Sequence, residues 1–186
     1  RILRRFLQPG DQVLHAGCGS GQVDQKVRYL FKLTACDISA GAVRMYNQVN
    51  WPHSECAVAD ILDLPYEDNR FDGLYNMGVM EHFSEEQIRL AFSEFYRVLR
   101  PGGRIVIFWP PLKSPIRHVL SAFHWLARLF DTKTKDLLYP PEISRVASQS
   151  QGEAWLREAG FRPVYCEFSA LDLYTQYAFV AEKPHA

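Results

Sequence analysis

The sequence predicts an α/β fold with a largely parallel sheet that helices cover on both faces. Short apolar segments alternate along the chain with segments whose apolar residues recur at helical spacing, and this alternation is typical of parallel βαβ units. The first four apolar segments each end at a glycine, an Asp or an Asn. The length of 186 residues suits one domain, so we expect residues 1–186 to fold as a single unit.

The composition excludes several classes of protein. With 47% hydrophobic and 23% charged residues, the chain can bury enough apolar surface to be ordered. The longest apolar run, Ile105–Leu112, is far shorter than the roughly 20 residues that span a bilayer. The 21 basic and 21 acidic side chains cancel, which argues against a nucleic-acid partner bound through bulk charge but not against a local basic patch. We therefore expect no nucleic-acid partner.

The four cysteines predict small buried side chains rather than a metal site. They form no C-x-x-C pair, and no histidine lies at ligand spacing from any of them, so a structural zinc is not expected. Each lies in or beside an apolar segment, as free cysteines in a reducing compartment do. We expect no metal and a cytoplasmic location. The cysteines are Cys18, Cys36, Cys56 and Cys166.

The first elements follow from their apolar spacing. The chain opens at Arg1 with a segment that resembles the last turns of a helix whose start is missing. Val13–Ala16 is a short apolar run before glycines and predicts a buried strand. Val23–Phe31 carries its apolar residues on one face and predicts a helix. Leu33–Cys36 predicts the second strand, and Ser39–Gln48 predicts a helix with a serine in the N-cap position.

The middle of the chain continues the same alternation. Glu55–Ala59 predicts the third strand and Phe71–Asn76 the fourth. Ser84–Leu99 predicts a helix, whose first residue forms a capping box with Gln87. Arg104–Trp109 predicts the fifth strand, which is entered through a Pro-Gly-Gly turn.

The pattern changes after the fifth strand. Pro110–Ser150 is a long insertion with prolines near both ends. Glu153–Ala159 predicts a helix that ends at Gly160. Phe161–Phe168 and Tyr174–Glu182 predict two strands that form an antiparallel hairpin.

A ligand site is expected where the strands end. In open parallel sheets, ligands bind beyond the carboxyl ends of the strands, where the strand order reverses. The first strand leads into the glycine-rich turn of residues 17–21, whose backbone can approach a ligand closely. Asp37 ends the second strand, where it can accept hydrogen bonds from ribose, and Asp60-Ile61 follows the third. These features indicate an adenosine ligand, although the glycine string alone also fits a tight turn that needs small residues.

The spacing of these motifs distinguishes between adenosine ligands. A dehydrogenase fingerprint would have its third glycine where Gln22 stands, and no phosphate-binding Gly-Lys-Ser/Thr loop is present. The compact G-x-G-x-G with its two carboxylates instead resembles the class I S-adenosylmethionine-dependent methyltransferases. The resemblance runs from Gln12 to Lys183. Its matching segments are residues 13–21, 36–39, 60–66, 71–76, 80–83 and 97–103.

The resemblance implies both a fold and a set of binding residues. The implied fold is a Rossmann-like, doubly wound sheet of seven strands whose last strand is antiparallel. By position, the glycine-rich turn would meet the methionine portion of S-adenosylmethionine, Asp37 the ribose, Ile38 and Ile61 the adenine faces, and Asp60 its amine. The implied cofactor-binding residues are His15, Gly17, Cys18, Gly19, Gly21, Asp37, Ile38, Asp60, Ile61, Asn76 and Met77.

His15 departs from the family pattern. The family usually has Asp or Glu two residues before the first glycine, where a carboxylate helps position the cationic methionine end. A charged imidazolium there would oppose that end, so His15 must be neutral or the cofactor binds more weakly than usual.

Two residues are candidates for the chemistry. His82, which follows Glu81 beyond the fourth strand, is a candidate general base if the acceptor keeps its proton at neutral pH. The alternative is a structural role in which His82 and Glu81 order the loop at a helix start. The resemblance points to the broad branch that methylates metabolites, quinones and lipids, so a small-molecule acceptor is expected.

Substrate specificity is expected in residues 112–135 of the insertion. Apolar residues recur there at helical spacing, and five basic residues against one Asp give a net charge of +4. One interpretation is a lid that covers the active site and makes weak contact with a membrane surface. The other is an ordinary amphipathic helix with a solvated basic face.

Two rival functions follow from the same residues. A non-catalytic module that binds S-adenosylmethionine on behalf of a partner protein would explain His15 and would turn over no acceptor. A nicotinamide-dependent oxidoreductase would prefer NAD to S-adenosylhomocysteine. The sequence leaves the oligomeric state open.

Overall fold

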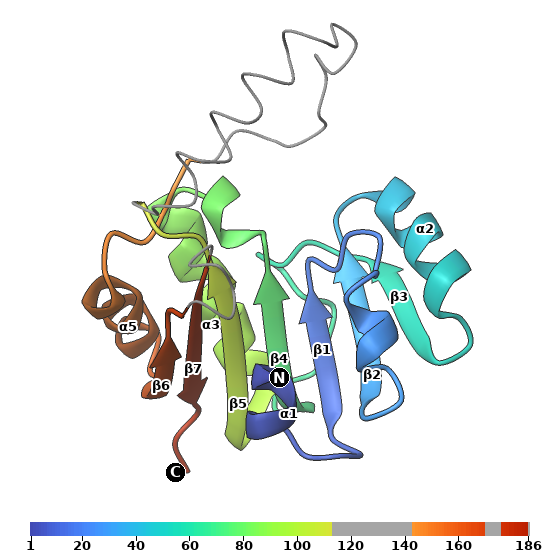
Figure 1. Ribbon diagram of the computed structural model, residues 1–186, viewed down its shortest axis with the longest axis horizontal. Coiled ribbons are helices and arrows are strands. Elements are labelled where there is room, and N and C mark those ends of the chain that lie inside the picture. The colour runs from blue at the N-terminus through green and yellow to red at the C-terminus, as the bar shows by residue number, and fades with distance from the viewer. Residues whose placement is uncertain (113–142, 170–175, 186) are drawn as a thin grey trace, which may run out of the picture.

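The computed structural model describes residues 1–112, 143–169 and 176–185. Seven strands among these residues form one sheet in the order β3-β2-β1-β4-β5-β7-β6 (Figure 1). Their bounds are β1 Gln12–Ala16, β2 Lys32–Asp37, β3 Ser54–Val58, β4 Phe71–Met77, β5 Leu99–Trp109, β6 Arg162–Glu167 and β7 Tyr177–Glu182.

The strand directions confirm the expected sheet. β1 is parallel to β2 and β4, β2 is parallel to β3, and β4 is parallel to β5. β7 is antiparallel to both β5 and β6, so the C-terminal strands form the predicted hairpin at one side of the sheet. From β1, the strand order continues in two opposite directions, through β2 to β3 on one side and through β4 to β6 on the other. The carboxyl ends of β1 and β4 therefore form the switch point of a doubly wound Rossmann-like sheet.

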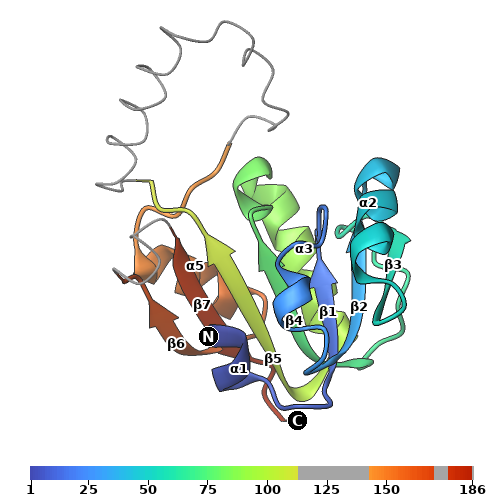
Figure 2. The same cartoon turned by 45° about the vertical axis from the view of Figure 1, so that its right-hand side comes forward.

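Helices cover both faces of the sheet (Figure 2). α1, the 3-10 turn η1 and α2 lie on one face, and α3 and α5 lie on the other. The second 3-10 turn, η2, follows β4 at the carboxyl edge. The bounds are α1 Ile2–Phe6, η1 Asp24–Lys26, α2 Ala40–Asn50, η2 Met80–His82, α3 Glu85–Val98 and α5 Gln149–Glu158. No helix in the described ranges is long and apolar enough to cross a membrane.

The helix predicted over Val23–Phe31 is wrong. The chain there forms only η1 and further turns, in which the amide of Val27 donates to the carbonyl of Asp24 three residues before it. The carboxylate of Asp24 is fully buried and accepts hydrogen bonds from the hydroxyls of Tyr46 and Tyr75. These tertiary contacts fix the backbone more strongly than the local apolar periodicity does.

Other predicted elements are present with shifted ends. α3 has the predicted capping box between Ser84 and Gln87. α5 begins four residues before the predicted start, because Ser148 caps it by accepting a hydrogen bond from the amide of Gln151. β5 begins at Leu99 rather than Arg104, since Leu99 already pairs with β4.

The insertion is only partly described. Residues 113–142, and with them nearly all of the segment 112–135 expected to carry specificity and membrane contact, lie outside the described residues. The end of the insertion is held beside its beginning, because Val146 forms a parallel bridge with Pro111, two residues after β5. The amides of Ile143 and Ser144 both donate to the carbonyl of Glu81, which ties this return to η2.

Candidate active site

A cavity of about 540 Å³ lies along the carboxyl edge of β1, β2 and β4. Its walls come from the turn after β1, the end of β2 with the start of α2, the segment after β3, and the segment around η2. The lining residues are Gly17, Gly19, Asp37, Ile38, Ser39, Ala42, Ala59, Asp60, Ile61, Leu62, Gly78, Val79, His82, Phe83 and Gln87. The switch point predicted from the strand ends is therefore hollow.

The glycine-rich turn is held against β2 by its own backbone. The amides of Gly17 and Cys18 donate to the carbonyl of Cys36 at 2.8 and 3.0 Å. The next amide, that of Gly19, donates to Asp37 Oδ2 at 2.9 Å. Gly19 adopts a φ of +53°, and no heavy atom lies within 4 Å of the position of a Cβ there. The backbone of this turn thus offers a ligand open space along the cavity.

Gly21 has a packing role instead. Its φ is +72°, and a Cβ would come within 2.3 Å of the side chains of Tyr46 and Asn50. The Asn50 side-chain amide also donates to the Gly21 carbonyl at 3.0 Å. A glycine is required because α2 packs directly on the turn, and Gly21 does not line the cavity.

The carboxylate of Asp37 is fixed by two backbone amides. Gly19 donates to Oδ2 and Ser39 donates to Oδ1, each at 2.9 Å. Ser39 in turn caps α2 by accepting a hydrogen bond from the Ala42 amide. Each carboxylate oxygen keeps a further lone pair for a ligand hydroxyl. Ile38, beside it, lines the cavity and is 71% exposed.

The segment after β3 brings a second carboxylate and an apolar side chain into the cavity. Asp60 Oδ1 accepts a hydrogen bond from the amide of Leu62 at 2.9 Å, while Ile61 is buried. The chain just beyond is clamped by α3, because Arg97 donates to the carbonyls of Leu64 and Tyr66 at 2.9 and 2.7 Å. This clamp holds the Asp60-Ile61 pair at the sheet edge.

Glu94 completes the clamp. Its carboxylate accepts hydrogen bonds from Arg97 and from the amide of Leu64, each at 2.8 Å. The hydrogen bonds from Arg97, aided by that amide, lower the pKa of the Glu94 carboxyl against the opposing effect of burial.

The opposite part of the cavity is formed by η2 and the start of α3. Gly78, Val79, His82 and Phe83 line it, together with Gln87 of the capping box. Glu81 is buried and lies outside the lining, and its carbonyl receives the anchored return of the insertion. Of the two catalytic candidates, His82 lines the cavity, whereas the backbone carbonyl of Glu81 holds the return of the insertion.

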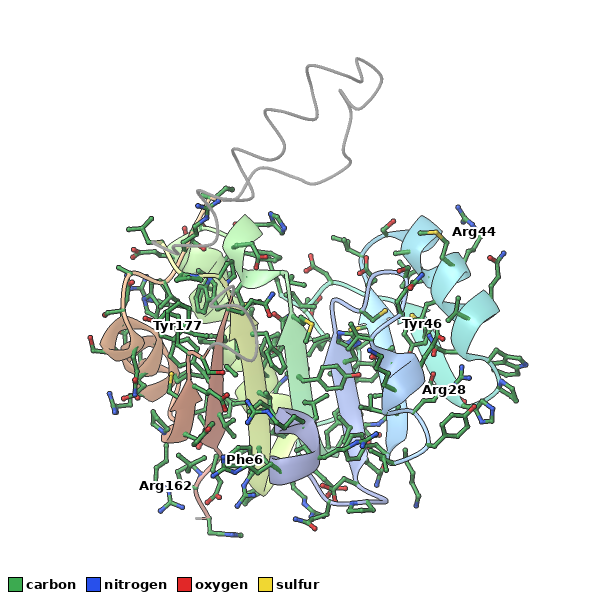
Figure 3. The ribbon with its side chains drawn as sticks, in the orientation of Figure 1. Phe6, Arg28, Arg44, Tyr46, Arg162 and Tyr177 are labelled. Carbon is green, nitrogen blue, oxygen red and sulfur yellow. The ribbon has the colours of Figure 1, made fainter. Side chains whose placement is uncertain are left out.

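His15 belongs to a buried polar network beneath the glycine-rich turn. Its Nδ1 lies 2.9 Å from Asp24 Oδ2, and its ring stacks on that of Tyr75 with centroids 4.1 Å apart. Tyr46, labelled in Figure 3, extends from α2 and donates its hydroxyl hydrogen to Asp24 Oδ2 at 2.7 Å. Burial and the Asp24 carboxylate raise the pKa of Tyr75 well above its usual range, so its hydroxyl stays a donor to Asp24.

This network bears on the predicted conflict between His15 and a cationic ligand. Asp24 is fully buried, and its Oδ2 lies 2.9 Å from Nδ1 of the imidazole, so an acidic side chain accompanies His15 in the core. Asp24 thus places a carboxylate beside the position where the family usually has Asp or Glu. His15 itself is 2% exposed and does not line the cavity.

The structure brings together about half of the predicted site residues. Seven of them line the cavity: Gly17, Gly19, Asp37, Ile38, Asp60, Ile61 and His82. The others lie outside the lining: His15, Cys18, Gly21, Asn76, Met77 and Glu81. Asn76 is fully buried at the end of β4, where its side-chain amide donates to the carbonyl of Ala16. Its position joins β4 to the β1 end instead of opening toward a ligand.

Several lining residues were not among the predicted ones. Ser39 follows the predicted Asp37-Ile38 pair, and Phe83 follows the predicted His82. Gln87 lies in the capping box that the sequence did identify. A signal therefore existed for all three: each is within five residues of a predicted strand end or site residue. Val79 also lies near predicted site residues, two positions after Met77, but no motif marks its apolar side chain for the cavity.

The fold and this cavity define the class: an α/β protein with a hollow switch point in a doubly wound sheet, whose lining suits an adenosine-type ligand. Residues 14–107 match the family model described as "Methyltransferase domain". That match covers half of the chain, and the chain belongs to this family of class I S-adenosylmethionine-dependent methyltransferases.

Individual proteins agree with this assignment. The chain is 36% identical over 120 residues to a probable tRNA methyltransferase 9B from Bos taurus, a match covering 62% of this chain and 26% of that protein. A methyltransferase structure from Methanosarcina mazei superposes with a TM-score of 0.75 at 19% identity, covering 100% of this chain and 98% of the other. The Burkholderia thailandensis 1,6-didemethyltoxoflavin-N1-methyltransferase, solved with S-adenosylhomocysteine, gives 0.71 at 20% identity, covering 99% and 76%.

The two kinds of similarity differ in reach. The structural matches extend over the whole chain and share its fold. The sequence match to the mammalian relatives named tRNA methyltransferase 9B spans only about a quarter of their length, between 24% and 26%. Relatives of this family act on tRNA and on small molecules, so family membership leaves the acceptor undetermined.

Proposed function

We propose that this chain transfers a methyl group from S-adenosylmethionine to a small-molecule acceptor. The observation that carries the proposal is the cavity in which Gly19 and Asp37 share one enclosure with His82. Its volume of about 540 Å³ is typical of sites for small ligands. The zero net charge of the chain and the small acceptor named for the Burkholderia thailandensis enzyme support the same acceptor class.

The lining residues fit S-adenosylmethionine. The open backbone at Gly19 suits the methionine portion, and the remaining lone pairs of Asp37 suit the ribose hydroxyls. Ile38 and Ile61 would contact the adenine ring, and Asp60 would accept a hydrogen bond from its amine.

The main contribution of the protein to the reaction is to position the cofactor and the acceptor. The cofactor, when bound, supplies a methyl group that its sulfonium has already activated. The chain must hold the acceptor in line and exclude water, for which Val79 and Phe83 provide apolar surface. His82, which lines the cavity, would accept the proton of an acceptor that retains it at neutral pH.

A second candidate acceptor is tRNA. The 36% identity to a probable tRNA methyltransferase favours it, although that similarity covers a quarter of the relative's length. Small molecules and tRNA require different acceptor surfaces on the same cofactor site, so one assay can separate them.

The first experiment is a calorimetric titration of the chain with S-adenosylhomocysteine, with NAD as the control ligand. Asp37→Ala is expected to weaken binding by about 1–3 kcal/mol, since the carboxylate would lose its hydrogen bonds to ribose. Glu67→Ala, at an exposed position outside the cavity, is the matched control and should leave the affinity unchanged. Binding of NAD in preference to S-adenosylhomocysteine would refute the cofactor assignment.

The second experiment identifies the acceptor class. The chain is incubated with methyl-labelled S-adenosylmethionine and either a pool of apolar and anionic metabolites or total tRNA. Label in the metabolite pool supports the proposal, whereas label in tRNA alone overturns it in favour of the second candidate. Tight S-adenosylhomocysteine binding with no labelled product from either pool would instead favour a cofactor-binding module that serves a partner.

The role of His82 can be tested on the same reaction. As a general base, His82→Gln should lower kcat while the affinity for S-adenosylhomocysteine and the melting temperature stay unchanged. A residue that only orders the loop would lower the melting temperature or the affinity instead.

A further inference from the structure

Two cysteines far apart in the sequence meet beside the glycine-rich turn. The Sγ atoms of Cys18 and Cys56 lie 3.4 Å apart, and both cysteines are free thiols. Cys18 belongs to the turn itself, and Cys56 belongs to β3, the strand at the end of the sheet. They pack with Ala35 and Tyr46 in a small cluster between α2 and the sheet. No other pair of cysteine sulfurs is in contact within the described parts of the chain.

Small oxidants can reach this pair through Cys56. Cys56 is half-buried and lines a second cavity of about 420 Å³, together with Trp51 and Arg70. Cys18 is 5% exposed and lies behind it. Burial raises the pKa of the Cys36 and Cys166 thiols to about 12, and no sulfur contact is found for either within the described residues.

We propose that Cys18 and Cys56 are a site of reversible oxidation, at which a peroxide converts the two thiols into a disulfide that connects the cofactor-binding turn to β3. In the first step Cys56 sulfur attacks the peroxide, an S–O bond forms, the O–O bond breaks, and one water leaves. In the second step Cys18 sulfur attacks the sulfenic sulfur of Cys56, the S–S bond forms, and the hydroxyl leaves as water with the Cys18 proton. Two thiols are oxidised and one peroxide is reduced to two waters.

The order of the two steps follows from the contact between the sulfurs. The hydrogen bond to Cys56, together with burial, raises the pKa of Cys18 far above its usual range, so Cys18 keeps its proton while Cys56 is reduced. Cys56 is half-buried and lines the second cavity, whereas Cys18 is 5% exposed, so peroxide reaches Cys56 first. Cys56 is thus the sulfur oxidised first and Cys18 the one that resolves it.

The disulfide would disturb the cofactor site that we propose. A disulfide has an S–S distance of about 2.05 Å, so the sulfurs must approach by roughly 1.4 Å from their 3.4 Å separation. Cys18 lies between Gly17 and Gly19, whose backbone lines the cavity. Since the proposed ligand contacts are to the backbone of this turn, we expect oxidation to weaken S-adenosylhomocysteine binding on the order of tenfold, the loss of about one hydrogen bond.

The disulfide itself is tested without reference to function. The full chain is reduced, exposed to hydrogen peroxide, alkylated and digested under non-reducing conditions. The expected result is a cross-linked peptide that joins Cys18 to Cys56, lighter than the two thiol peptides by two hydrogens and separated by dithiothreitol. Cys166→Ser should still form it and Cys56→Ser should not. Free thiols at both positions after peroxide, or stable sulfinic acid at Cys56 in place of the cross-link, overturns the proposal.

The consequence is tested by titrating reduced and oxidised chains with S-adenosylhomocysteine. Wild type and Cys166→Ser should lose about tenfold in affinity on oxidation and recover it with dithiothreitol, while Cys56→Ser should be insensitive. An oxidised wild type that binds as tightly as the reduced one overturns the link between the disulfide and the site. This part rests on the proposed function, and failure of the reduced chain to bind S-adenosylhomocysteine would refute that function while leaving the peptide map to decide the disulfide.

Discussion

The two faces of the sheet are built from different chemistry. On the face covered by α3 and α5, the core is largely apolar and contains the rings of Phe92, Phe95 and Trp109. The buried charge of Lys183 lies at its edge, bonded to the carbonyls of Tyr96 and Leu99. On the face covered by η1 and α2, the buried residues include Asp24, joined to one histidine and two tyrosines. Apolar packing is non-directional, whereas each hydrogen bond fixes a distance and an angle. The first face therefore supplies stability, and the second also fixes the position of the glycine-rich turn.

The largest effect is expected on the polar face. Asp24→Ala removes the acceptor shared by His15, Tyr46 and Tyr75, and leaves three buried polar groups without it. The free energy of unfolding should fall by about 3–5 kcal/mol, as when one partner of a buried charged pair is removed. Urea denaturation measures it, and Asp11→Ala, outside the network, is the control. A loss below about 1 kcal/mol would show that the three contacts of Asp24 do not stabilise the fold together.

The apolar face should give a loss of similar size with a different consequence. Phe95→Ala removes a fully buried ring and should also cost about 3–5 kcal/mol. Because the cavity it leaves is far from the turn after β1, the affinity for S-adenosylhomocysteine should stay at the wild-type value at temperatures where the variant is folded. Asp24→Ala should weaken that affinity under the same conditions. Equal affinities in the two folded variants would contradict the division of roles between the faces.

The ion pair between Glu94 and Arg97 makes part of the stability of the α3 face depend on pH. The pKa of Glu94 is lowered in the folded state, so its contribution to stability is present above the ordinary carboxyl pKa of 4.5 and is lost as the pH falls through the lower folded value. Glu94→Gln should cost about 1–2 kcal/mol at neutral pH, and the difference from wild type should shrink below about pH 4. Denaturant titrations over this range measure it. If the difference in unfolding free energy between wild type and Glu94→Gln grew as the pH fell, the prediction would be wrong.

The smallest effect is expected at the start of α3. Ser84→Ala removes the side chain that accepts a hydrogen bond from the Gln87 amide and should lower the free energy of unfolding by about 1 kcal/mol. The same substitution at Ser148, the cap of α5, should have a similar effect. Since Gln87 lines the cavity, Ser84→Ala should also change the affinity for S-adenosylhomocysteine, whereas Ser148→Ala should not. Thermal denaturation and calorimetry separate the two.

The predictable parts of the molecule were those set by short stretches of sequence. Apolar runs of a few residues predict strand ends within two residues of those observed at Asp37, Val58 and Met77, and the capping box of α3 follows from two residues three apart. The turn at residues 23–31 could not be found in this way. Its apolar residues have helical spacing, and only the contacts of Asp24 with residues 22 and 51 positions later fix another backbone.

The same distinction applies to the site. The sequence by itself determined the order of the elements, the switch point, and the glycine and carboxylate positions that line the cavity, because each follows from where a strand ends. Only the tertiary structure decided that Asp24 stands beside His15, that His82 rather than Glu81 faces the cavity, and that Cys18 touches Cys56. These are contacts between side chains of separate elements, and their geometry depends on how helices and strands pack, which no local pattern of residues encodes.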